Sequence, residues 1–251
     1  MLTLFPTGVA AASSRPSDDA LAAITARGTL LAEYDVAAWQ STDAVTASHP
    51  AEGLIERYIA RKTDAGWIVD FGRLNSSGDK FLVAYEAVQT DSPAGYEVKS
   101  FRPVREDVGW NLSAARAVEL ATRDFGPTTR PYNIAVLPGD AGSLYVYLYP
   151  AQVKVGVYPL GGDVRYRVSP DGSSVTEKRQ MHKSIIESVS ADQKVKIESG
   201  YHSHVLSDVP EDTDVLLVLT RQPKVPEIVV TPHYMYTIAT DGTITVADHP
   251  K

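Results

Sequence analysis

Two histidines and one aspartate in the C-terminal third of the chain have the spacing of metal ligands. His202 and His204 belong to a Gly-Tyr-His-Ser-His stretch, and Asp214 follows the acidic loop 207–213. If the stretch is a strand, alternate side chains share a face, and the imidazoles project together roughly 6–7 Å apart. Asp214 would then open a buried strand over residues 215–219. Two imidazoles and a carboxylate leave a fourth position for water, as a zinc hydrolase requires.

The same residues allow a second interpretation. A His-x-His pair on a strand can be hydrogen-bonded into a polar network, and the acidic loop can be a solvated turn with a helix cap. His182 is a further candidate ligand or proton carrier, although a histidine beside a lysine can equally be packed or solvated. The residues alone leave these alternatives open.

Composition restricts which classes of site and partner fit this chain. Of its 251 residues, 43% are hydrophobic and 22% are charged, which is typical of a globular protein. A formal net charge of -7 disfavours nucleic acid as a partner, because phosphate binding needs clustered cations. Cysteine is absent, so any metal must be held by histidines and carboxylates. No run approaches the roughly 18 apolar residues of a membrane span.

The first sixteen residues resemble the second half of a secretory signal. They combine a short apolar stretch with an Ala-x-Ala type cleavage region, but they lack a basic start. Such a truncated signal segment would place the protein outside the cytoplasm, in a periplasmic or secreted location. The alternative is an apolar N-terminus with no targeting role.

The N-terminal part predicts a small α+β domain over residues 17–90. Ser17 can cap a helix that we expect to end near Gly28. Residues 67–72 and 80–85 flank a polar loop and predict a hairpin. A linker over residues 91–110 should follow, because its prolines and glycines leave few positions for regular structure.

The C-terminal part, residues 111–251, predicts one helix followed by a β-rich, mostly antiparallel domain, so the fold class is α+β. The helix should cover residues 112–124, since Gly126 and Pro127 follow it. Turn residues between alternating apolar runs predict the hairpins. These hairpins pair 132–137 with 144–149, 164–168 with 174–176, and 236–238 with 243–245.

A row of tyrosines marks one face of the predicted strand 144–149. Tyr145, Tyr147 and Tyr149 should point one way, opposite to the aliphatic residues between them. The row could stack on a sugar or peptide, but we favour packing under a neighbouring element, because exposed aromatic stripes are uncommon without a ligand.

The histidine stretch and Asp214 resemble the JAMM motif of the JAB/MPN metalloenzymes. That motif is a His-x-His pair behind a Gly-aromatic strand, followed by a loop with Ser and then Asp. Gly161 and Gly162 resemble the family's Gly-Gly strand, and the resemblance covers roughly residues 145–246. It implies a zinc ion on His202, His204 and Asp214 and a peptidase or isopeptidase activity.

The chain departs from the family pattern at the general base. In the family a Glu before the Gly-containing strand activates the water, whereas Leu160 stands nearest to that place here. The remaining candidates for the base are Asp163, Glu177 and Glu187. Val205 also replaces the usual Pro after the second His, and Glu211 stands where the Ser would be.

Two hypotheses therefore follow. The first is a zinc-dependent hydrolase with His202, His204 and Asp214 on the ion. The second is a non-catalytic binding or assembly module, in which the tyrosine-bearing sheet or the acidic loop contacts a protein or peptide partner.

Overall fold

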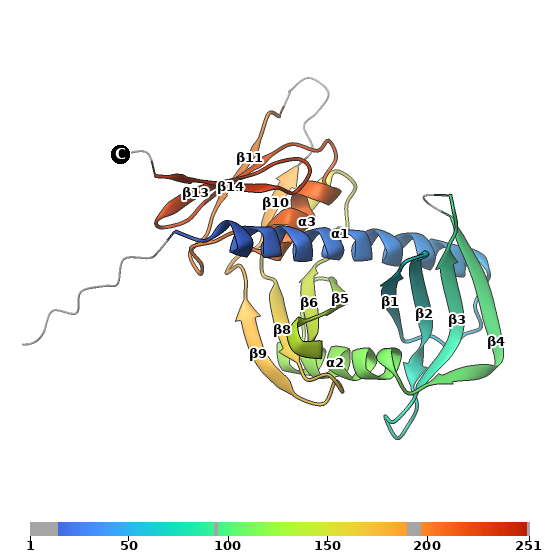
Figure 1. Ribbon diagram of the computed structural model, residues 1–251. Helices are drawn as coiled ribbons and strands as arrows, with labels where there is room; N and C mark the ends of the chain where they lie inside the picture. Colours follow the sequence, from blue (N-terminus) through green and yellow to red (C-terminus); the bar gives the residue numbers. More distant parts are fainter. Residues whose placement is uncertain (1–14, 93–94, 190–196, 250–251) are drawn as a thin grey trace, which may run out of the picture.

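A computed structural model describes residues 15–92, 95–189 and 197–249, and it confirms an α+β fold. The predicted secretory segment, residues 1–16, falls almost entirely outside these described residues. The longest element is α1, Asp18–Ala47, whose N-terminus is capped by the Ser17 side chain. Figure 1 shows α1 lying across two sheets, with α2, Trp110–Phe125, along their other side.

The helix α1 does not end near Gly28, as the sequence suggested. A Cβ atom on Gly28 would lie 2.5 Å from the Cβ of Val215 and 2.6 Å from the carbonyl oxygen of Asp212. Gly28 therefore lets α1 pack closely against α3, Asp212–Thr220, and does not terminate the helix.

The first sheet is antiparallel, with the strand order β1-β2-β3-β4. The predicted hairpin is confirmed as β2 and β3. The bounds of the four strands are Arg57–Thr63, Gly66–Leu74, Phe81–Gln89 and Tyr96–Asp107.

The segment predicted as a linker, residues 91–110, was wrongly expected to lack regular structure, since β4 covers most of it. A strand at the edge of a sheet tolerates proline, and β4 occupies such an edge, which explains how Pro103 is accommodated.

The second sheet is also antiparallel and contains two of the predicted hairpins, in the order β5-β6-β8-β9. Its strands are Tyr132–Pro138, Leu144–Pro150, Val164–Val168 and Val175–Gln180. The tyrosine row of β6 alternates as predicted. All three rings are buried in the core that α1 covers, so the packing interpretation is correct.

The third sheet lies beside α3 and has the order β11-β12-β13-β14. Its strands are Gly200–Ser203, Glu227–Val230, Tyr234–Ile238 and Ile244–Asp248. The last two form the third predicted hairpin, and β11 runs parallel to β12. A separate pair, β7 (Val157–Leu160) and β10 (Ile186–Val189), completes the strands.

Three apolar cores hold these layers together. One lies between α1 and the two large sheets, one between α2 and the opposite faces of those sheets, and one joins α1, α3 and the third sheet. The first core draws on side chains from both sides of the predicted boundary at residues 91–110. The division into two domains stays a prediction.

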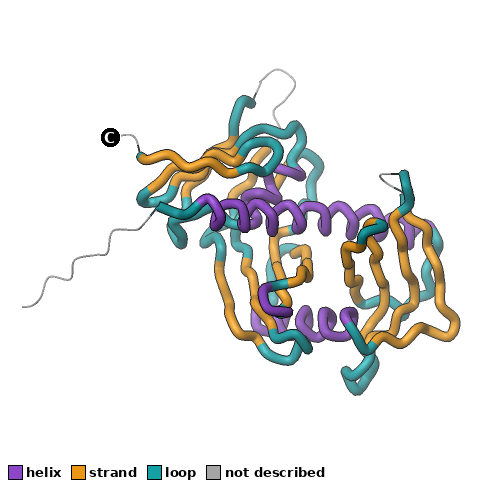
Figure 2. Tube along the Cα trace, in the orientation of Figure 1, coloured by secondary structure: helices purple, strands orange, loops and turns teal. Residues whose placement is uncertain are grey.

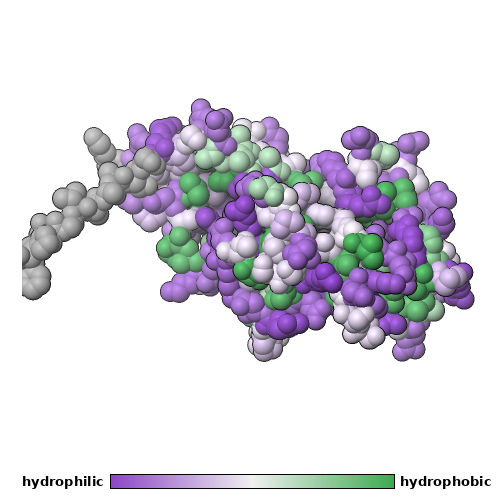
Figure 3. All heavy atoms as spheres, turned by 60° about the horizontal axis from the view of Figure 1, so that its bottom comes forward, coloured by the Kyte–Doolittle hydropathy of each residue, from purple (hydrophilic) through white to green (hydrophobic). Residues whose placement is uncertain are grey.

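Figure 2 shows the helices flanking the strands. On the face drawn in Figure 3, hydrophilic residues surround smaller apolar areas. Within the part of the chain that the structure describes, none of the helices has the length and apolar character needed to span a membrane.

Candidate metal centre

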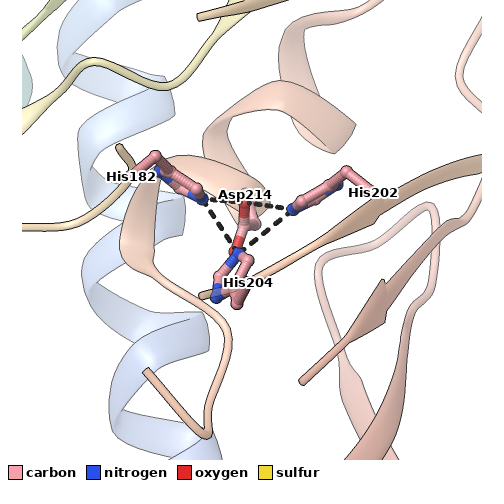
Figure 4. A group of neighbouring side chains, drawn as sticks. All are labelled: His182, His202, His204 and Asp214. Carbon is pink, nitrogen blue, oxygen red and sulfur yellow. Dashed lines mark hydrogen bonds and ion pairs between the residues drawn. The ribbon is translucent and has the colours of Figure 1, made fainter. Parts of the chain in front are cut away.

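Three histidines and one aspartate converge beside the third sheet (Figure 4). His202 lies in β11, His204 directly follows that strand, and His182 follows β9. Asp214 belongs to the first turn of α3. All four side chains are buried, so the sequence prediction of a shared face for the two strand histidines holds, with Ser203 exposed between them.

The donor atoms of these residues are as close as ligands of one ion. The Nε2 atom of His204 lies 2.9 Å from Nε2 of His182 and 3.2 Å from Nε2 of His202. The carboxylate of Asp214 lies 3.0–3.1 Å from all three Nε2 atoms. Zinc bonds of about 2.0–2.1 Å place neighbouring ligands of a tetrahedron roughly 3.3 Å apart. The group could therefore hold a metal ion.

The hydrogen bonds on the far side of each ring fix which nitrogen carries the proton. Nδ1 of His182 lies 2.8 Å from Asp163, and Nδ1 of His202 lies 2.9 Å from Glu227. Nδ1 of His204 lies 3.0 Å from the carbonyl oxygen of Val209. Because these oxygens accept, each Nδ1 donates, and loss of a proton from Nε2 would leave a lone pair free to bind an ion at the centre.

Without an ion, protonated rings of His182 and His202 supply the positive charge that faces the Asp214 carboxylate. Burial would lower the pKa of His182, but the carboxylates of Asp214 and Asp163 instead raise it to about 11. Burial likewise lowers the pKa of His202, and Asp214 with Glu227 raises it to about 9. Burial raises the pKa of Asp214, yet His182 and His204 hold it well below its usual range. A cation at the centre would satisfy the same donors.

Glu227 is the support behind His202 and is itself held in place. Its Oε2 atom forms a 2.8 Å ion pair with Arg221, and both side chains are buried. A Cβ atom on Gly200 would lie 1.8 Å from Oε2 of Glu227 and 2.6 Å from Arg221. The glycine that opens β11 therefore leaves the space in which the support of His202 sits.

Asp163 performs the same task for His182. Its carboxylate accepts hydrogen bonds from the backbone N–H of His182 and from the Thr213 hydroxyl. Thr213 belongs to α3, so the support of His182 is tied to the helix that carries Asp214.

The first turn of α3 corrects a second expectation, since Asp214 was predicted to open a strand over residues 215–219. The segment is a helix, and the Glu211 backbone N–H donates to the Asp214 carboxylate at 2.7 Å. An apolar run buried on all sides has no periodicity to separate a helix from a strand. The Asp214 carboxylate thus caps a helix as well as facing the histidines.

Asp212 anchors this helix to the rest of the molecule. Its carboxylate is 2.7 Å from Arg165 and 3.0 Å from Arg27, and it accepts a hydrogen bond of 2.9 Å from Tyr147. Arg179 pairs with the neighbouring Glu211 at 2.6 Å. Contacts from α1, β6, β8 and β9 therefore fix the position of α3.

A groove of about 610 Å³ gives access to the histidines. We call it the histidine groove. The described residues that line it include His182, His202, His204, Lys183, Ile186, Tyr201, Val205 and Leu206.

The three candidates for a general base lie in different places. Asp163 is buried behind His182 and does not line the histidine groove. Glu177 lies exposed on β9, and Glu187 lies on β10 at 3.6 Å from Arg130. Their catalytic role stays a prediction.

The sequence did not assign the fourth donor or the supports. The sequence left open whether His182 is a ligand or a packed side chain, and no motif pointed to Glu227. Asp163 was predicted as a candidate general base, and not as the support of a histidine. Comparison of the chain with models of protein families, with curated proteins and with solved structures finds no match.

Proposed function

We propose that this protein is a metal-dependent hydrolase whose ion, zinc, is held by His182, His202, His204 and Asp214. The observation that carries the proposal is the convergence of three Nε2 atoms and one carboxylate within 4.8 Å of one another beside an open groove. Three imidazoles and one carboxylate suit zinc among the common ions, because imidazole is a favoured ligand of zinc and Ca²⁺ and Mg²⁺ prefer oxygen.

The side chains behind the donors have defined tasks in this proposal. Asp163 and Glu227 accept from the Nδ1 atoms, which orients the rings and makes their Nε2 atoms better donors. Arg221 balances the charge of Glu227. Because four residues already complete a tetrahedron, zinc in a hydrolase would have to accept a fifth ligand from the histidine groove. It would then supply a Lewis acid that polarises a carbonyl group and lowers the pKa of water.

The resemblance to the JAB/MPN metalloenzymes supports a peptidase or isopeptidase as the class of hydrolase. The matching residues are His202, His204 and Asp214. His182 has no counterpart in the motif, and Leu160 lines the histidine groove near the place of the family's Glu.

A non-catalytic binding or assembly module is the second candidate. Two observations favour it. Four protein donors complete the tetrahedron of a structural zinc site. In addition, the described residues that line the histidine groove include no Asp or Glu to act as a base.

Metal analysis of the purified protein tests the shared part of both candidates. We expect about one zinc per chain, lost in the His202→Ala/His204→Ala variant and kept in His233→Ala, whose histidine is exposed and pairs with Asp208. Protein without metal, with a melting temperature unchanged by EDTA, would contradict the hydrolase and the structural zinc site, and would favour a binding module that holds no metal.

Cobalt substitution then separates the two candidates. An ion that can accept a substrate changes its visible spectrum when azide or a hydroxamate is added. A spectrum that does not change when these ligands are added, together with no hydrolysis of peptide substrates, would favour the structural module.

A further inference from the structure

The histidine groove has apolar walls that remain exposed. Ile186 comes from β10, Tyr201 from β11, and Val205 and Leu206 follow β11. Their exposed fractions are 44%, 66%, 69% and 47%. Large apolar side chains gathered on an exposed surface mark a place where apolar ligands bind.

One cation stands in this apolar groove. Lys183 lines it, is exposed, and directly follows His182, so the two Cα atoms are about 3.8 Å apart. Among the described residues no ion pair is found to Lys183, nor to Lys99, Lys154 or Lys224, whereas Lys62, Lys80 and Lys178 pair with carboxylates. The described residues that line the groove include Lys183 but no arginine, aspartate or glutamate.

We propose that the histidine groove binds an amphiphilic anion, an apolar chain or side chain with one acidic group. The apolar part lies against Tyr201, Val205 and Leu206, and the acidic group pairs with Lys183. This inference rests on the proposed hydrolase and names its substrate class, since Lys183 lines the same groove as the three histidines. An acylated amino acid or the terminal residue of an apolar peptide has this chemistry.

Charge complementarity supports this ligand over a neutral apolar one. The protein carries a formal net charge of -7, yet the charged residue of the groove is a cation. An unpaired lysine in apolar surroundings favours a ligand that brings the opposite charge.

Calorimetric titration with three eight-carbon ligands tests the inference. The probes are octanoate, octanesulfonate and the neutral octanamide, added to the zinc-loaded protein. We expect both anions to bind about two- to fivefold more tightly than the amide, the effect of an ion pair at a partly exposed site. Sulfonate is a weak metal ligand, so its advantage reports the lysine and not the ion.

Two variants and one short ligand complete the test. Lys183→Gln should remove the advantage of octanesulfonate, and Lys224→Gln, at an exposed lysine away from the groove, should keep it. Val205→Ser should weaken all three ligands, and acetate should bind far more weakly than octanoate. A sulfonate advantage that survives Lys183→Gln, or acetate binding as well as octanoate, would overturn the inference.

The outcome is separable from that of the proposed function. The titrations measure binding and need no turnover, and they can be repeated on metal-free protein. A protein that lacks zinc or hydrolase activity but shows the Lys183-dependent preference contradicts the function alone. A zinc hydrolase without the preference contradicts this inference alone.

Discussion

The helices α2 and α3 bury different kinds of side chain: α2 buries mainly apolar ones, whereas the first turn of α3 buries polar ones. α2 packs an alanine-rich face against one side of the two large sheets, and its first turn has no side-chain cap. α3 and its cap bury four consecutive polar residues, 211–214, each bonded to a different part of the molecule. Buried polar groups cost free energy unless they are paired.

The difference shows what a metal centre requires of its scaffold. Apolar packing covers most of the buried face of α2, and Asn111 is its one buried polar side chain among the described residues. Hydrogen bonds and ion pairs fix how α3 is rotated about its axis and where it lies along that axis. They thereby position the Asp214 carboxylate as accurately as a metal ligand requires. Mutation, removal of the metal and changes of pH each test this difference between the two helices.

The largest effect should come from Asp212→Ala. It leaves Arg27, Arg165 and the Tyr147 hydroxyl without their buried acceptor, so we expect a loss of about 3–5 kcal/mol in the free energy of unfolding. Urea denaturation measures the change.

The matched control is Glu119→Ala on α2, where an exposed pair with Arg123 should contribute no more than about 0.5 kcal/mol. If Asp212→Ala does not fold, Arg27→Met removes one of the two arginines and should still destabilise. Equal effects of the α2 and α3 variants would remove the contrast.

Removal of the metal should have the next largest effect. Zinc at 100 to 1,000 times its dissociation constant stabilises the folded state by about 2.7–4.1 kcal/mol, and EDTA should abolish this gain. Hydrogen exchange should show the loss of protection mainly in α3 and β11. An equal loss in α2 would mean that the ion stabilises the whole molecule and not the α3 side of it.

The support behind a histidine should matter less than the ion. Glu227→Gln weakens the acceptor of His202 and leaves Arg221 without its charge partner, so we expect metal affinity to fall about 10–100-fold. Competition with a chromophoric chelator measures it. Glu119→Gln on α2 serves as the control, and an unchanged affinity in Glu227→Gln would show that the carboxylate does not tune the site.

The smallest effect concerns Asp70, a buried carboxylate that α2 contacts. Asp70 accepts from Asn111 of α2 and from Arg105; burial raises the pKa of Asp70, and these partners lower it only in part. A raised folded-state pKa means that the folded protein holds the proton more tightly than the unfolded chain does. Stability from this group is therefore complete below about pH 4 and is lost as pH rises through the folded-state pKa.

Asp70→Asn should remove this slope. Denaturation from pH 3.5 to pH 7 would show it as a difference between wild type and variant that changes with pH. A constant difference would show that Asp70 does not titrate differently in the two states.

The parts of the site that the sequence predicted are local ones. His202 and His204 are two residues apart, and strand periodicity alone puts them on one face. Asp214 was expected near them, although on the wrong type of element, because a fully buried helix and a fully buried strand have the same apolar run.

The parts that the sequence missed depend on long-range pairing. His182 reaches the centre through the β9 to β10 connection, and Glu227 reaches His202 because β12 pairs in parallel with β11. Neither neighbour can be inferred from spacing along the chain. The same holds for β4, since only the strand order places Pro103 at an edge.

The continuity of α1 has a consequence for how the molecule comes apart. Its 30 residues, roughly 45 Å of helix, contribute side chains to the core against the two large sheets and to the core beside α3. Neither end of the molecule can lose its packing without exposing apolar side chains of the same helix. Because α1 belongs to both cores, unfolding of one end destabilises the other. The metal-bearing end and the β1–β4 sheet therefore melt together in one cooperative transition.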